Sequence, residues 1–331
     1  MDHVRLGKTG LKVSRLCLGT MTFGLQCDEP TSFGIMDRAA EGGITFFDTA
    51  DAYPLGGDQD LRGKTEEIIG RWLKGKRDDF IVATKCFVPM GSRPFQGGNS
   101  RRHILNAAEA SLRRLGTDYI DLYQLHGYDP ATPVDETLEA LDLLVRSGKV
   151  RYIGCSNWLA WQLARAIGRS EAKNLAVFVS VQPRYNLLFR EFERELFPLC
   201  LDDGVGVIPY NPIAGGMLSG KHDRSKAPET NTRFGYQNYA GVMYRERYWK
   251  DPIFDKVQQL QDVAHAAGIP LPTMAVAWVL ANPAITSPII GASRPDQLDA
   301  TLKAVDVKLD DETLKTLDEL TREFRKGDSQ R

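Results

Sequence analysis

Cysteine is scarce in this chain of 331 residues and follows no recognisable pattern. The five cysteines are scattered and odd in number, and none has the C-x-x-C spacing, which argues against a disulfide framework and against a zinc site. No apolar run reaches about 18 residues, so we expect no membrane span. The first ten residues, MDHVRLGKTG, lack the apolar core of a signal peptide. These absences together favour a reducing, cytoplasmic location.

A strong net charge is missing as well. The 42 Lys and Arg residues nearly balance the 43 Asp and Glu residues, so nothing indicates a nucleic acid or an anionic membrane as a partner. The hydrophobic content of 42% is that of an ordinary globular protein. No repeat appears at the level of residue identity, and one α/β barrel commonly fills about 250 residues or more. We therefore predict a single domain over residues 1–331.

The regular feature of the chain is an alternation of short apolar runs with longer amphipathic segments. The apolar runs do not alternate strictly between apolar and polar residues, as expected for parallel strands covered on both faces. They are Arg15–Leu18, Ile44–Phe47, Phe80–Thr84, Tyr119–Leu125, Val150–Gly154, Val177–Val181, Gly206–Pro209 and Ser287–Ile290. The helical patterns are Thr31–Gly42, Lys64–Lys74, Ser100–Leu115, Pro133–Ser147, Trp158–Ser170, Phe189–Asp202, Pro252–Ala267 and Pro295–Ala304. Eight such units predict an α/β fold, a (β/α)8 TIM barrel.

Several segments fall outside this alternation. Val4–Val13 contains a turn signal and is interpreted as an N-terminal β-hairpin, and Asp311–Phe324 as an extra C-terminal helix. The polar tail 325–331 is predicted to be flexible. Two long loops, 86–99 and 215–251, follow strands, so they belong to the barrel face that carries active sites.

Polar residues stand where the predicted strands end, the position from which barrel enzymes draw their chemistry. Asp48, Lys85 and His126 follow three of these strands, and Tyr53 lies five residues after Asp48. Each residue alone has an ordinary interpretation as a turn, a cap or a solvated strand end. Their convergence on one barrel mouth, however, favours a catalytic site.

At these residues the chain resembles the aldo-keto reductase family over essentially its full length. The matching blocks occur in family order: RLGKTGLKVSRLCLGTMTFG, FFDTADAY, KTEEIIGRWL, VATK, DLYQLHGYDP, GKVRYIGCSNW, VQPRYN, IPYNPIAGGMLSGK and IIGASRPDQL. The resemblance implies an oxidoreductase that reduces small aldehydes and ketones to alcohols with a nicotinamide cofactor and without a metal. It also implies that the catalytic residues are Asp48, Tyr53, Lys85 and His126.

The chemistry of these side chains fits such roles. A carbonyl that receives hydride develops negative charge on its oxygen and needs a proton, for which we propose Tyr53 as the general acid. A free tyrosine has a pKa of about 10, and we expect the Lys85 ammonium to lower the pKa of Tyr53. Asp48 would pair with Lys85, and His126 would orient the substrate carbonyl.

The resemblance further implies a set of cofactor-binding residues. They are Gly19, Thr20, Met21, Ser156, Asn157, Gln182, Tyr210, Asn211, Pro212, Ile213, Ala214, Gly215, Lys221, Arg233, Gly291, Ser293, Arg294, Gln297 and Thr301. Ser293 and Arg294 open the last barrel helix, and a helix N-terminus with an arginine fork is a good phosphate site. We therefore expect NADPH, with NADH as the alternative. Ala300 and Thr301 replace the Glu and Asn that read adenine in the family, which puts adenine recognition in question.

Substrate contacts are the least specified part of the sequence. We expect Phe23, Phe87, Tyr128 and Trp158 beside the catalytic residues, although ordinary packing explains each of them equally well. The segment Pro54–Gly63 is longer than the usual turn of the family and is expected to reshape the rim of the pocket. Two other functions remain open: a nicotinamide-cofactor-binding regulatory or sensor subunit with slow turnover, and a sugar isomerase or lyase. The sequence gives no indication of oligomeric state.

Overall fold

Eight parallel strands form the barrel in the computed structural model, which describes residues 1–230 and 232–326. Hydrogen-bonded neighbours follow the order β10-β3-β4-β5-β6-β7-β8-β9, and the bridges Val207–Ile285 and Tyr210–Ile289 join the two ends of the sheet. The strands are β3 (Cys17–Gly19), β4 (Phe46–Asp48), β5 (Ile81–Cys86), β6 (Ile120–Leu125), β7 (Val150–Ser156), β8 (Phe178–Gln182), β9 (Gly206–Val207) and β10 (Ile289–Ile290). Each of the eight strands overlaps one of the apolar runs predicted to be strands. The prediction of a (β/α)8 barrel is confirmed.

The N-terminal hairpin closes one end of this barrel. It consists of β1 (His3–Arg5) and β2 (Lys12–Ser14), paired antiparallel as predicted. Leu6 and Val13 are fully buried against the apolar side chains that fill the barrel, which are Cys17, Phe46, Ala83, Leu122, Ile208 and Ile289. Because the hairpin seals the end where the strands begin, a ligand must enter from the end where the strands finish.

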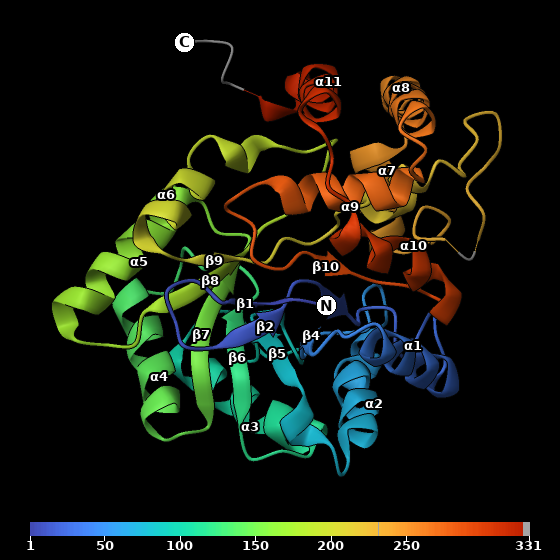
Figure 1. Cartoon of the computed structure of the whole chain (residues 1–331). Coiled ribbons are helices and arrows are strands. Elements are labelled where there is room, and N and C mark those ends of the chain that lie inside the picture. Colours follow the sequence, from blue (N-terminus) through green and yellow to red (C-terminus); the bar gives the residue numbers. More distant parts are fainter. Residues whose placement is uncertain (231, 327–331) are drawn as a thin grey trace.

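Helices surround the barrel and bury a second, larger apolar cluster against its outer face (Figure 1). They are α1 (Glu29–Glu41), α2 (Lys64–Leu73), α3 (Arg101–Leu115), α4 (Val134–Arg146), α5 (Ala160–Lys173), α6 (Leu196–Asp203), α7 (Tyr239–Tyr248), α8 (Asp251–Ala266), α9 (Leu271–Ala281), α10 (Leu298–Leu302) and α11 (Asp311–Thr321). The predicted extra C-terminal helix is α11, which packs against α8. Of the predicted flexible tail, residues 327–331 lie outside the described residues.

Two helices correct the sequence-based prediction. Helix α9 went unpredicted because LPTMAVAWVLA is apolar on every side, so it shows no amphipathic period. Helix α7 lies inside the segment 215–251 that was predicted to be a loop. Its apolar and polar residues also lack a helical period, and its start is specified by Asn238, whose side-chain Oδ1 accepts from the Gly241 amide at 3.2 Å.

None of the helices in residues 1–230 and 232–326 is by itself both long and apolar enough to cross a membrane. Within the described residues, one pair of helices, α8 and α9, is long and apolar enough when taken together, but the two are bent by 90° relative to each other.

Helix α11 is tied to the rest of the molecule by a buried arginine. Arg190 donates to both carboxylate oxygens of Glu193 at 2.8 Å, to Asp318 at 2.5 Å and to the Thr321 hydroxyl at 2.8 Å. Its side chain is only 4% exposed. A charge in such a place is stable only while its partners remain.

We predict that Arg190→Ala lowers the free energy of unfolding by about 3 kcal/mol, because Glu193 loses its buried partner and α11 loses its attachment. Urea unfolding measures the loss, and amide exchange should rise first in α11. The matched control is Lys315→Ala on the exposed side of α11, where the ion pair to Glu319 spans 3.9 Å and both partners are exposed. A stability change in the control as large as that of Arg190→Ala would contradict the prediction.

Candidate active site

A buried ion pair stands at the centre of the barrel mouth. Strand β4 ends in Asp48 and the neighbouring strand β5 carries Lys85, and the Lys85 Nζ lies 2.6 Å from the Asp48 Oδ2. The ammonium also donates to the Thr49 carbonyl at 2.7 Å. Both side chains are almost completely buried, at 0% and 3% exposure. The predicted pairing of Asp48 with Lys85 at neighbouring strand ends therefore agrees with the structure.

Two amide side chains complete the surroundings of Asp48. The Nε2 atoms of Gln182 and Gln124 donate to Asp48 Oδ1 at 2.8 and 3.1 Å. Gln182 was predicted as a cofactor residue, but Gln124 was missed. A signal for it existed in the sequence: Gln124 is a polar residue near the end of strand β6, two residues before His126 and hence on the same face.

The rings of Tyr53 and His126 lie above this ion pair. Their centroids are 5.7 Å apart in an edge-on arrangement, and the Lys85 Nζ lies 5.2 Å from the centroid of Tyr53. Contrary to the sequence-based expectation, the pKa of Tyr53 is raised well above 10, first by burial and then by the negative charge of Asp48. The correction has a physical reason: the Lys85 ammonium is paired with Asp48, which weakens its effect on the phenol, so that burial outweighs it. Tyr53 is therefore a protonated phenol at neutral pH.

His126 is neutral in this environment. Burial, followed by the nearby charge of Lys85, lowers its pKa to about 3. Its Nδ1 is buried and has no hydrogen-bond partner in the part of the chain that the structure describes. A neutral imidazole can donate one hydrogen bond without bringing a charge into the site.

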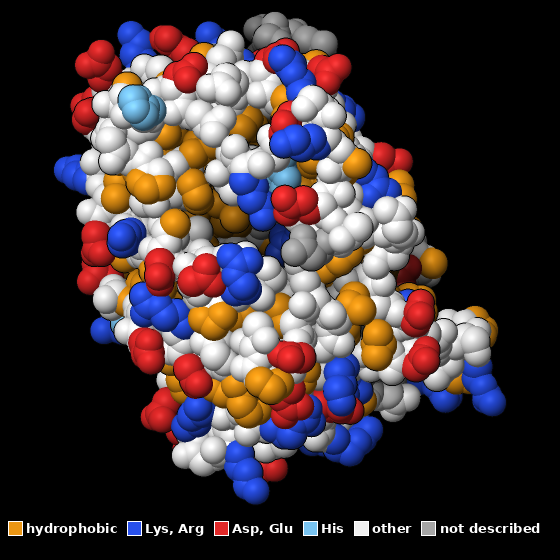
Figure 2. Space-filling view, turned by 90° about the vertical axis from the view of Figure 1, so that its right-hand side faces the viewer, with side chains coloured by type: hydrophobic (Ala, Val, Ile, Leu, Met, Phe, Trp, Pro, Cys, Tyr) orange, Lys and Arg blue, Asp and Glu red, His pale blue; other side chains and the backbone are white. Residues whose placement is uncertain are grey.

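These side chains form the floor of a cavity of about 600 Å³, a size typical of small-molecule sites. Asp48, Tyr53 and His126 line it, while Lys85 is buried beneath them. All the predicted cofactor residues also line it except Ala214, whose side chain is fully buried. Figure 2 shows a hollow in this face with hydrophobic side chains on its walls and Lys and Arg side chains beside it.

Hydrogen bonds order one wall of the cavity. Ser156 donates to the Gln182 carbonyl at 2.8 Å, and Asn157 donates to the His126 carbonyl at 3.0 Å. The Tyr210 hydroxyl donates to Asn157 Oδ1 at 2.8 Å. Asn157 has a φ of 61°, a left-handed conformation that is uncommon for residues other than glycine and is concentrated at functional sites. This network positions the amide and phenol groups around His126.

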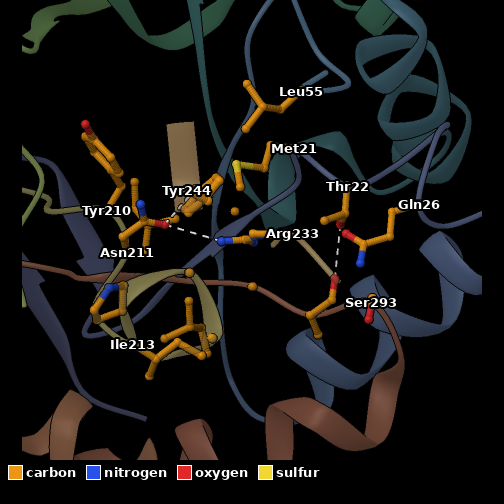
Figure 3. Close-up of a pocket in the computed structure, with 18 of the residues that line it drawn as sticks. Met21, Thr22, Gln26, Leu55, Tyr210, Asn211, Ile213, Arg233, Tyr244 and Ser293 are labelled. Atoms are coloured by element: carbon orange, nitrogen blue, oxygen red, sulfur yellow. Dashed lines mark hydrogen bonds between the residues drawn. The ribbon is translucent and has the colours of Figure 1, made fainter. Parts of the chain in front are cut away.

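Cationic side chains gather at the far end of the cavity. Figure 3 shows Arg233 pointing toward Asn211, whose Oδ1 accepts from Arg233 at 3.3 Å and from Tyr244 at 3.2 Å. The Asn211 Nδ2 is buried without a partner among the described residues. Among the described residues Arg294 pairs with Asp296, at 3.1 Å on the exposed surface, and Lys221 also lines this end. A buried amide donor without a partner, with three cationic side chains on the same cavity wall, fits a phosphate-bearing ligand.

The backbone near these cations passes through two glycines with positive φ values. Gly215 and Gly216 have φ values of 69° and 106°, and a Cβ on Gly215 would lie 2.5 Å from the ring of Tyr244. At the other side, the Ser293 backbone amide and hydroxyl both donate to Gln297 Oε1, at 2.8 and 3.1 Å. The residues that line the cavity between His126 and Arg294 fit a dinucleotide cofactor.

The predicted substrate residues need a correction. None of Phe23, Phe87, Tyr128 and Trp158 is among the described residues that line the cavity. Phe23 and Trp158 belong to the apolar core, at 0% and 1% exposure. Ordinary packing thus explains these two, and contact between the other two and a substrate stays a prediction.

Other side chains take their place on the cavity wall, and sequence reasoning missed them. Leu55 comes from the segment Pro54–Gly63, and Tyr239, Met243 and Arg247 come from α7. The two elements are joined, because Asn238, the N-cap of α7, donates to the Gly56 carbonyl at 2.8 Å. The longer segment after Tyr53 therefore does shape the rim, partly by holding α7.

Metal-ligand groupings are absent from residues 1–230 and 232–326, where no cluster of three or more His, Cys, Asp or Glu side chains could hold an ion.

Comparison with known proteins identifies the family. The model of the aldo/keto reductase family matches residues 15–322, nearly the whole chain. The chain belongs to the aldo/keto reductase family. It is 42% identical to an uncharacterized oxidoreductase, YrpG, of Bacillus subtilis, covering 97% of this chain and 96% of that protein. It is 36% identical to versiconal hemiacetal acetate reductase of Aspergillus parasiticus, with 96% of each chain covered. It is also 36% identical to a probable voltage-gated potassium channel subunit beta of Arabidopsis thaliana, covering 93% and 92%.

Membership makes the chain an enzyme of carbonyl reduction, acting on small molecules. Aldo/keto reductases generally bind nicotinamide cofactors, which agrees with the cavity described above.

The neutral His126, which is partly buried, gives the protein a pH-dependent stability. Its pKa is about 3 in the folded chain and about 6.5 in an unfolded one. Between pH 7.5 and pH 5 the unfolded chain gains a proton on His126 and the folded chain does not, so acid favours unfolding. We predict that the wild type loses about 2 kcal/mol more stability over this range than His126→Gln, as measured by urea unfolding. Equal losses in both proteins would show that His126 is charged in the fold.

Proposed function

We propose that this protein reduces aldehydes and ketones with NADPH, and that Tyr53 supplies the proton. The observation that carries the proposal is the protonated, buried Tyr53 above the Asp48–Lys85 pair, beside neutral His126 and at the end of a cavity that fits a dinucleotide. When bound, NADPH would supply the hydride.

In the proposed reaction each catalytic residue has a different role, which depends on its position. His126, held by its backbone and neutral, directs an N–H to the carbonyl oxygen and so orients it toward Tyr53. Tyr53 donates its proton as negative charge develops on that oxygen. Lys85, fixed by Asp48 and the Thr49 carbonyl, then lies near the forming phenolate and stabilises it. In the reverse direction Tyr53 acts as the general base.

The cofactor would be held along the rest of the cavity. Ser156, Asn157 and Gln182 offer both donors and acceptors to a carboxamide, and Tyr210 offers a ring for stacking. Lys221 and Arg233, which line the same cavity, would contact the pyrophosphate. Arg294 would pair with the 2′-phosphate that distinguishes NADPH from NADH. A cytoplasmic location and independence from metals accompany this proposal as predictions.

We predict that Tyr53→Phe lowers kcat by about 10²- to 10⁴-fold, since the phenol is the proton donor. The dissociation constant of NADPH, measured by quenching of tryptophan fluorescence, should change by less than about twofold. The matched control is Tyr119→Phe, which removes a phenol that bonds Asp78 on the exposed surface. Full activity in Tyr53→Phe would refute the assignment of Tyr53 as the acid.

We further predict that Arg294→Gln weakens NADPH binding by about tenfold and leaves NADH binding within about twofold, because only NADPH carries the 2′-phosphate. Fluorescence titration with both cofactors gives the two dissociation constants. Arg102→Gln, which removes an exposed arginine from α3, controls for the loss of one positive charge. An equal effect on NADPH and NADH would contradict this role.

A second function is favoured by one group of relatives. The Arabidopsis protein and one from rice, 34% identical, are both named as probable potassium channel subunits beta. A regulatory subunit that senses the cofactor would bind NADPH tightly and turn over slowly. Stopped-flow kinetics give the rate of a single turnover, which is then compared with the steady-state rate. An efficient reductase continues at a high rate after the first turnover, whereas a sensor subunit that keeps its cofactor slows down.

A further inference from the structure

Helix α7 carries a cationic residue, Arg247, that has no role in the proposed reaction or in the proposed binding of the cofactor. Tyr239, Met243 and Arg247, spaced four residues apart, lie on one face of the helix, and all three line the cavity. The helix is fixed at its start by Asn238, which donates to the Gly56 carbonyl, and near its end by Arg245, which donates to the Tyr236 carbonyl at 2.9 Å. Arg247 is thus placed on the wall by a held helix rather than by a free loop.

The Arg247 guanidinium has no partner in the described part of the chain. No hydrogen bond, ion pair or stacking on an aromatic ring engages it, and it is only partly exposed. Among the described residues on the cavity wall, the one carboxylate is Asp48, which Lys85 already holds. An arginine that is half buried and faces no anion is costly to keep unless a ligand supplies one.

Arg247 lies near the catalytic end of the cavity. Its positive charge lowers the pKa of Tyr210 and of Tyr239 against the effect of burial. Those two phenols in turn act on Tyr53, whose pKa they help to raise. The Tyr210 hydroxyl donates to Asn157, and Asn157 donates to the His126 carbonyl, so hydrogen bonds link a phenol near Arg247 to the wall around His126.

Two other arginines near these phenols are already engaged. Arg62 donates to the Pro89 carbonyl, and Arg184 lies over the ring of Phe189 at 3.5 Å. Neither is among the described residues that line the cavity.

We propose that Arg247 is a specificity-determining residue that binds a carboxylate on the substrate, so that the preferred substrates are carbonyl compounds that also carry an acid group. The planar guanidinium matches a carboxylate with two parallel hydrogen bonds. Leu55, Met21 and Met243 provide apolar wall for the carbon frame between the acid and the carbonyl. This inference rests on the proposed reductase function and names the substrate class of the same site.

The experiment compares two aldehydes that differ only in charge, 4-carboxybenzaldehyde and its methyl ester, with NADPH as reductant. In Arg247→Gln we expect kcat/KM for the acid to fall by at least about tenfold, mainly through KM, and that for the ester to change by less than about threefold. Arg247→Lys should recover part of the loss, because it restores the charge without the planar fork. Arg224→Gln, at an exposed arginine paired with Asp255, controls for net charge and should leave the ratio unchanged.

The outcomes separate this inference from the proposed function. If the wild type reduces neither aldehyde nor any other carbonyl compound with NADPH, the reductase function fails. If both aldehydes are reduced and Arg247→Gln alters their kcat/KM values equally, the reductase stands and the role of Arg247 is refuted. A rise in the dissociation constant of NADPH in Arg247→Gln, with no change in the ratio, would also refute it by assigning Arg247 to the cofactor.

A second measurement uses only the wild type, so the misfolding of a variant cannot affect its result. Benzoate should inhibit reduction of the methyl ester by the wild type competitively, and its inhibition constant should be at least about tenfold lower than that of benzamide. Equal inhibition by the two compounds would overturn the proposal.

Discussion

The buried pair of Asp48 and Lys85 is the interaction on which the site depends. Two opposite charges lie 2.6 Å apart at the end of adjacent strands, and neither is exposed to solvent. A charge in such a place requires several partners, and the barrel provides them: two glutamine amides for Asp48 and the Thr49 carbonyl for Lys85. Strands β4, β5, β6 and β8 each contribute one of these side chains, so only a closed barrel can assemble the cluster.

The protonation state of Tyr53, the proposed acid, follows from this pairing. Because Asp48 neutralises Lys85, burial decides the pKa of Tyr53, which rises. Burial decides the pKa of His126 too, and lowers it. The site thus holds two neutral hydrogen-bond donors above one compensated ion pair. This arrangement suits a reaction in which negative charge appears only at the transition state.

The rim of the cavity is built by different elements from its floor. The floor comes from strand ends, whose positions the barrel fixes. The rim comes from the segment after Tyr53 and from α7, which are joined through Asn238 and Gly56. Substitutions in these two elements are therefore expected to change substrate preference without moving the proposed catalytic residues, as in other barrel enzymes. Arg247 stands on the rim, which is where a determinant of specificity belongs.

The sequence by itself determined the barrel, the hairpin and the identity of the four catalytic candidates. Strands and amphipathic helices leave local patterns, and polar residues at strand ends stand out against apolar runs. It also placed almost all the cofactor candidates, because they follow the same strand ends or belong to matched blocks. The tertiary structure alone decided the rest. Helix α9 is apolar on all sides and α7 has no period, so neither is visible locally. The pKa of Tyr53 and the partners of Asp48, like the burial of Phe23 and Trp158, depend on residues far apart in the chain. Arg247 lines the cavity from a helix whose N-cap, Asn238, bonds Gly56, 182 residues earlier in the chain.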